Sequence, residues 1–127
     1  MADLTQTTFD VSVGADTFIF KVPSVREYAR LGIRSRELRR ADSPTGTGDE
    51  WGLDGTTADL YRGMALFETL LQKADARDNW PYSTDDSGKP SVDSSKFPPQ
   101  ATQSVILAYQ GFETQYQRFL GDWSANR

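Results

Sequence analysis

The sequence predicts an α+β domain in which an N-terminal β-hairpin packs on about three α-helices, with long polar loops between the helices. Two observations support this prediction: an early segment alternates apolar and polar residues, and three later segments repeat apolar residues at helical spacing. The length of 127 residues is that of a single domain, which we expect to span 1–127. The expected elements are a hairpin at about 8–22 and helices at about 24–40, 58–76 and 101–123.

The hairpin is predicted from a period of two on both sides of a turn at Gly14, which can adopt a positive φ. A two-stranded hairpin alone is barely stable in water, so it must lie on a helix, join further strands or add to a partner's sheet. Ile19 lies on the opposite face of its strand from the inward-facing residues and is a candidate partner contact. The inward-facing residues are Phe9, Val11, Val13, Phe18, Phe20 and Val22.

The helix at 24–40 begins with a capping box, in which Ser24 caps free amides and Glu27 bonds back. Its apolar stripe is thin, and it is rich in arginine. The segment from Ser24 to Ala41 holds six arginines and two glutamates, a net charge of +4, so the rest of the chain must carry −8 to give the total of −4.

Three interpretations of this arginine-rich helix remain open. It is a solvated face, a docking surface for an acidic partner helix or another copy's acidic loops, or a nucleic-acid contact. An isoelectric point near 4.7 argues against a general affinity for nucleic acid. The candidate partner-binding residues in this helix are Arg30, Arg34, Arg36, Arg39 and Arg40.

The segments 42–57 and 77–100 are predicted to be loops, since glycine, proline and acidic residues are frequent in them. The first is longer than most connections in compact domains, which indicates a functional or partly disordered segment. Trp51 is a large apolar residue in this polar setting, and we therefore count it among the candidate partner-binding residues.

The two remaining helices are predicted from amphipathic spacing. An aromatic stripe of this kind is typical of a core, and the alternative is that part of it meets another chain. The stripe of the helix at 58–76 comprises Leu60, Met64, Phe67 and Leu71, and that of the helix at 101–123 comprises Val105, Tyr109, Phe112, Tyr116, Phe119 and Trp123.

The composition disfavours catalysis, and we expect that the protein is not an enzyme and needs no cofactor. The chain has no cysteine and no histidine, which removes thiol nucleophiles, the commonest general base and the commonest transition-metal ligand. Acidic pairs such as Asp49 and Glu50 sit among turn-forming residues, where a solvated surface is the expected role. We expect no membrane contact and a cytoplasmic location, because no signal segment or long apolar run occurs.

The order of parts resembles the tail assembly chaperones of long-tailed bacteriophages and prophages. The resemblance rests on the hairpin that leads into Val22-Pro23-Ser24-Val25-Arg26-Glu27, on the segment from Tyr61 to Leu71, on Asn79-Trp80-Pro81-Tyr82, and on the aromatic last helix. It implies a factor of the host cell cytoplasm that binds the tape measure protein and aids tail tube assembly through protein–protein contacts. It transfers no defined site residue. The separated basic and acidic regions of the chain would help copies to associate along such a client, so a homo-oligomer is a further expectation.

Three other functions remain as alternatives. The first is a structural component of the virion, either a head–tail connector or a tail terminator. The second is a small hydrolase or ligand-binding protein, which the missing histidine disfavours. The third is a regulatory or anti-defence protein that docks through the arginine-rich helix.

Overall fold

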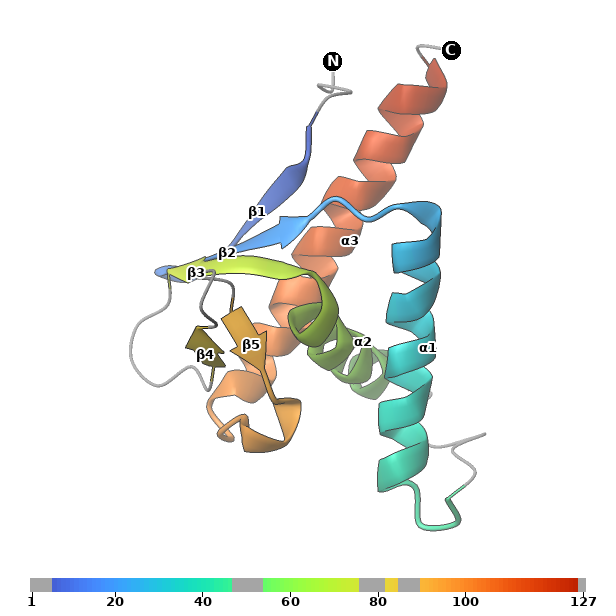
Figure 1. The fold of residues 1–127 in the computed structure, drawn as a ribbon, viewed down its shortest axis with the longest axis vertical. Helices are drawn as coiled ribbons and strands as arrows, with labels where there is room; N and C mark the ends of the chain where they lie inside the picture. Colours follow the sequence, from blue (N-terminus) through green and yellow to red (C-terminus); the bar gives the residue numbers. More distant parts are fainter. Residues whose placement is uncertain (1–5, 47–53, 76–81, 85–89, 126–127) are drawn as a thin grey trace.

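The computed structural model describes residues 6–46, 54–75, 82–84 and 90–125 and has the predicted α+β architecture (Figure 1). A three-stranded antiparallel sheet lies against two helices, and a third helix packs on one of these two. The elements in chain order are β1 (Thr8–Val13), β2 (Asp16–Lys21), α1 (Val25–Asp42), α2 (Gly55–Leu70), β3 (Leu71–Asp75), β4 (Tyr82–Thr84), β5 (Pro90–Val92), the 3₁₀ helix η1 (Ser94–Lys96) and α3 (Ala101–Ala125).

The predicted hairpin is confirmed as the pair β1 and β2, which turns at Gly14 with a φ of +60°. Its register pairs Phe9 with Phe20 and Val11 with Phe18. Residues directly opposite each other share one face of a sheet, so these four side chains form one apolar surface. All four are buried.

The prediction of a helix through residue 76 is wrong beyond Leu70, where the chain enters strand β3. β3 pairs with β2 and places it at the centre of the sheet, in the order β1-β2-β3. A bulge in this pairing sets Leu71 opposite Phe20 and Ala74 opposite Phe18, so both contribute to the apolar surface. The open edge of β2 offers a ladder of backbone partners, and completing a third strand outweighs another turn of helix.

The other border of the described sheet is the outer edge of β1. Two glutamine side chains reach its backbone: the Gln6 amide donates to the Thr8 carbonyl at 2.8 Å, and the Gln115 amide of α3 donates to the Asp10 carbonyl at 2.7 Å. Of the two hairpin edges that could add a partner's strand, one is therefore filled by β3. The other edge has two of its carbonyls engaged by side chains.

The helix starts follow local capping chemistry. The capping box of α1 is confirmed, with the Glu27 amide donating to Ser24 Oγ and the Ser24 amide donating to Glu27 Oε1. The residue that caps α2 is Asp54, whose carboxylate accepts from the Thr57 amide. α2 therefore starts three residues earlier than predicted.

The segment predicted as a loop from 77 to 100 contains regular structure where it is described. β4 and β5 pair as a two-stranded antiparallel ribbon, and η1 follows. The short strands lack the alternation that predicts longer ones, which is why the sequence pattern missed them.

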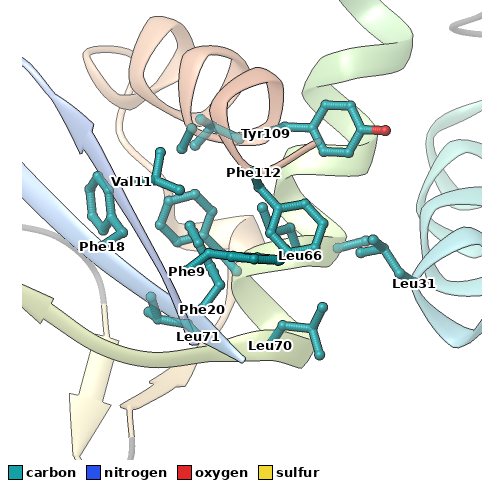
Figure 2. Close-up of a cluster of buried hydrophobic side chains, with 14 of the residues drawn as sticks. Phe9, Val11, Phe18, Phe20, Leu31, Leu66, Leu70, Leu71, Tyr109 and Phe112 are labelled. Atoms are coloured by element: carbon teal, nitrogen blue, oxygen red, sulfur yellow. The ribbon is translucent and has the colours of Figure 1, made fainter. Parts of the chain in front are cut away.

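The core lies between the sheet and helices α2 and α3 (Figure 2). Aromatic rings pack edge to face across it. The ring centroids of Phe9 and Phe112 are 5.8 Å apart, and the centroid of Phe67 lies 5.0 Å from that of Phe18 and 5.2 Å from that of Phe20. These edge-to-face arrangements are the favoured geometry for aromatic pairs.

The aromatic stripe of α3 is confirmed as core over most of its length. Val105, Tyr109, Phe112 and Tyr116 are buried, and Phe119 packs against the cluster while half-buried. The side chain of the last stripe residue, Trp123, lies outside the described part.

Candidate functional site

Helix α1 has a buried face and an exposed face of very different character. Leu31 and Ser35 are buried against the body, and Tyr28 and Leu38 pack on the core cluster. The opposite side carries Ile33, which is 58% exposed although it is one of the larger apolar side chains of the helix.

Exposed arginines surround Ile33 because positions three, four and seven residues apart share one side of a helix. We call this surface the outer face of α1, and it comprises Arg26, Arg30, Ile33, Arg36, Glu37 and Arg40, all of them exposed. Three of the predicted site residues, Arg30, Arg36 and Arg40, are thus brought together on one surface.

Arg34 is not part of this surface, because its guanidinium reaches the body of the protein. Its Nη2 lies 2.8 Å and its Nε 3.1 Å from Glu68 Oε1 of α2, and its Nη1 lies 3.2 Å from Glu37 Oε2. The other Glu68 oxygen accepts from Ser94 Oγ at 2.8 Å. The hydrogen bond with Glu68 raises the pKa of Arg34. Arg34 thus joins α1 to α2, and Glu68 continues the link to η1.

The remaining predicted site residues are dispersed. Arg39 is half-buried near the end of α1. Ile19 lies half-buried on the outward side of the sheet, paired with Asp10 on one side and Lys73 on the other. Trp51 lies outside the described residues.

A groove of about 630 Å³ lies beside α1 and is lined by residues of α1, α2 and α3. The first helix supplies Tyr28, Leu31 and Gly32 to its wall. A Cβ atom at Gly32 would meet nothing within 4 Å, so the wall is open there. The residues from the other two helices are Asp59, Arg62, Tyr109, Gln110, Glu113 and Thr114.

Glu113 is the centre of a hydrogen-bond network in this groove. Its Oε1 accepts from the Tyr28 hydroxyl at 2.7 Å and from the Gln117 amide at 2.8 Å, and its Oε2 accepts from the Tyr109 hydroxyl at 3.4 Å. Figure 2 shows the Tyr109 ring at the border of the core with its hydroxyl directed away from the cluster. Burial raises the pKa of Tyr28, with a further contribution from Glu113, and burial likewise raises the pKa of Tyr109 to about 12. Both hydroxyls therefore stay protonated and donate at neutral pH.

A second carboxylate, that of Asp59, lies at the α2 side of the groove. It accepts from the Gln110 amide at 3.0 Å, and the Arg62 guanidinium is 3.8 Å from its other oxygen. Arg62 keeps 53% of its side chain exposed. The groove thus holds two carboxylates and one guanidinium, a net charge of −1 beside the basic outer face.

Sequence reasoning missed both Ile33 and the groove. Ile33 had a signal, since it falls in helical phase with Arg26, Arg30 and Arg40. The groove had none, because Tyr28 and Glu113 are 85 residues apart in the chain and meet only in the folded structure.

No group of three or more histidine, cysteine, aspartate or glutamate side chains in the described ranges could hold a metal ion. Likewise, no helix in this part of the chain is long and apolar enough to cross a membrane.

Comparison with protein-family models, with curated proteins and with solved structures found no significant match in any of the three.

Proposed function

We propose that this protein is a phage tail assembly chaperone that acts in the host cell cytoplasm by protein binding alone. It binds the tape measure protein through the outer face of α1 and aids tail tube assembly. The observation that carries the proposal is Ile33, an apolar side chain that is 58% exposed at the centre of a basic helical face. The resemblance of the sequence to this family supplies the identity of the partner.

An exposed isoleucine among arginines favours a protein partner over a purely solvated face. Burying an isoleucine fully stabilises a complex by about 1.5–3 kcal/mol, and the aliphatic stems of arginines extend the apolar contact around it. A nucleic-acid contact gains little from such a residue, since phosphate binding depends on charge. The surface fits an amphipathic helix that carries acidic residues beside an apolar stripe.

The charge of this face suits a client that must be held and later released. Exposed charge pairs contribute about 0.2–1 kcal/mol each and weaken in salt. Complementary charge mainly speeds encounter, while the apolar centre sets the lifetime of the complex. Modest, salt-sensitive affinity is the property that a temporary coat on a client requires.

The test is co-expression with the tape measure protein, followed by pull-down and measurement of the amount of tape measure protein that stays soluble. A variant that combines Arg30→Gln, Ile33→Gln and Arg36→Gln keeps good helix formers while it removes the apolar centre and two charges. We expect the wild type to recover the client and this variant to lose at least about tenfold in affinity.

The matched control makes the same kind of change on α3, where Leu107 is 44% exposed and Arg118 is exposed. The double variant Leu107→Gln, Arg118→Gln should bind as the wild type does. Absence of the tape measure protein from the wild-type pull-down would overturn the proposal, and equal loss in both variants would remove the outer face of α1 as the binding surface.

A further inference from the structure

We propose that the groove between α1 and α3 is a second binding site, which takes an arginine side chain from a partner polypeptide. This site is distinct from the outer face of α1 and stands independently of the proposed function. It rests on the shape of the groove, on its two tyrosines and on the balance of charge inside it.

The shape of the groove fits a side chain together with a short stretch of backbone. Its volume of about 630 Å³ lies within the range of ligand sites and exceeds what one side chain fills. Gly32 leaves the wall open, because a side chain at this position would project into empty space. A peptide segment is therefore a better occupant than a free amino acid.

The chemistry of the groove fits a cation. Asp59 and Glu113 face a single guanidinium, that of Arg62, which is half-exposed and only 3.8 Å from Asp59. The aromatic rings of Tyr28 and Tyr109 line the same space, and aromatic rings attract cations through their electron-rich faces. Tyr109 is buried and one face of Tyr28 packs on Tyr116, so the half-buried Tyr28 is the ring that can contact a cation.

Arginine fits better than lysine because of the arrangement around Glu113. The carboxylate is held in place by three neutral donors, from Tyr28, Tyr109 and Gln117, so it is oriented before a ligand arrives. Two of these donors occupy Oε1 and one occupies Oε2, so a guanidinium can donate one N–H group to the acceptor position left on Oε2 and stack its plane on a tyrosine, which an ammonium cannot do. Orientation in advance lowers the entropic cost of binding.

The experiment titrates the full chain with the peptide acetyl-Ala-Ala-Arg-Ala-Ala-amide and with the same peptide in which citrulline replaces arginine. Citrulline keeps the shape of the side chain and removes its charge. We expect saturable chemical-shift changes at the backbone amides of Gly32, Gln110 and Glu113, with affinity for the citrulline peptide about tenfold weaker or more.

Two variants should move the affinity in opposite directions. Glu113→Gln keeps an acceptor for the tyrosine hydroxyls and removes the charge, so binding should weaken about tenfold. Arg62→Gln removes the competing guanidinium, so binding should tighten by about two- to fivefold. Asp10→Asn makes an equal charge change at an exposed position of β1, and it should leave the affinity unchanged.

Several results would overturn the proposal. These are no saturable binding of the arginine peptide, equal binding of the citrulline peptide, shifts that map outside the groove, or the same loss in Asp10→Asn as in Glu113→Gln. Since Glu113→Gln could also disturb the tyrosine network, its thermal unfolding is measured beside the titration. If that variant is unfolded, the Arg62→Gln and citrulline comparisons still decide the outcome.

Discussion

Two glycines on neighbouring helices have opposite surroundings. A Cβ atom at Gly63 of α2 would lie 2.6 Å from Val105 Cγ1 and 2.7 Å from the Val105 carbonyl oxygen of α3. A Cβ atom at Gly32 of α1 would meet nothing within 4 Å. The first glycine lets two helices touch backbone to side chain, and the second faces the groove.

The two glycines distinguish a tightly packed helix contact, between α2 and α3, from an open groove beside α1. α2 and α3 form the helical layer of the core and pack without spare room at Gly63. α1 is attached mainly to α2, through the Leu31 side and the Arg34–Glu68 pair, and it reaches α3 through the Tyr28 side chain, beside which the groove lies. A ligand therefore has room beside α1 but not between α2 and α3 at Gly63.

The largest effect should come from exchanging each glycine for alanine. Gly63→Ala should destabilise the protein by about 1–3 kcal/mol, because the methyl group would overlap Val105, part of which is unyielding backbone. Gly32→Ala should stabilise it by about 0.5–1 kcal/mol, since alanine is the better residue in a helix interior and has open space there. Urea unfolding of both variants measures the sign of each change in the free energy of unfolding. Equal signs would show that the two helix contacts do not differ as described.

A smaller effect on stability should come from the ion pair of Arg34 with Glu68, which distinguishes Arg34 from the arginines of the outer face of α1. The pair with Glu68 is partly shielded, with 14% of the Glu68 side chain exposed against 39% for Arg34, so we expect a coupling of about 1 kcal/mol. A double-mutant cycle with Arg34→Gln and Glu68→Gln measures this coupling by unfolding. Arg36→Gln with Glu68→Gln is the control and should show no coupling. A coupling free energy of zero for Arg34 and Glu68 would mean that Arg34 is available to bind a partner.

The smallest effect should be an acid dependence at the start of α1. The hydrogen bond from Lys21, with that from the Ser24 amide, lowers the pKa of Glu27 from 4.5 to about 2. A carboxyl whose pKa is lower in the folded state contributes stability above its unfolded pKa and loses it as pH falls. The contribution of Glu27 is thus present above about pH 4.5 and lost towards pH 2.

Glu27→Gln should make the fall in Tm between pH 4.5 and pH 2 shallower than in the wild type, as measured by circular dichroism. Lys21→Gln removes the largest cause of the shift and should reproduce part of this change. Parallel wild-type and variant curves over this range would contradict the capping argument.

The sequence allowed prediction of the features that depend on near neighbours. The turn at Gly14, the capping box at Ser24 and Glu27, and the buried stripe of α3 all follow from residues within a few positions of one another. The α+β class follows from these elements together.

Features decided by distant partners could not be predicted. Leu71 fits a helical stripe as well as a strand, and the edge of β2, where Phe20 lies 51 residues earlier, decides between them. Arg34 and Arg30 are equivalent in the sequence until Glu68 is placed beside one of them. The groove depends on the spacing between α1 and α3, which no local pattern encodes.

The two glutamine side chains that bond to the backbone of β1, from Gln6 and Gln115, have a consequence for the behaviour of the protein at high concentration. A sheet with an open, flat border can recruit the same strand from another molecule and grow into fibrils. Here an added strand would have to displace the Gln6 and Gln115 amides from the carbonyls of Thr8 and Asp10. The β1 border of the sheet is thereby protected against the addition of further strands.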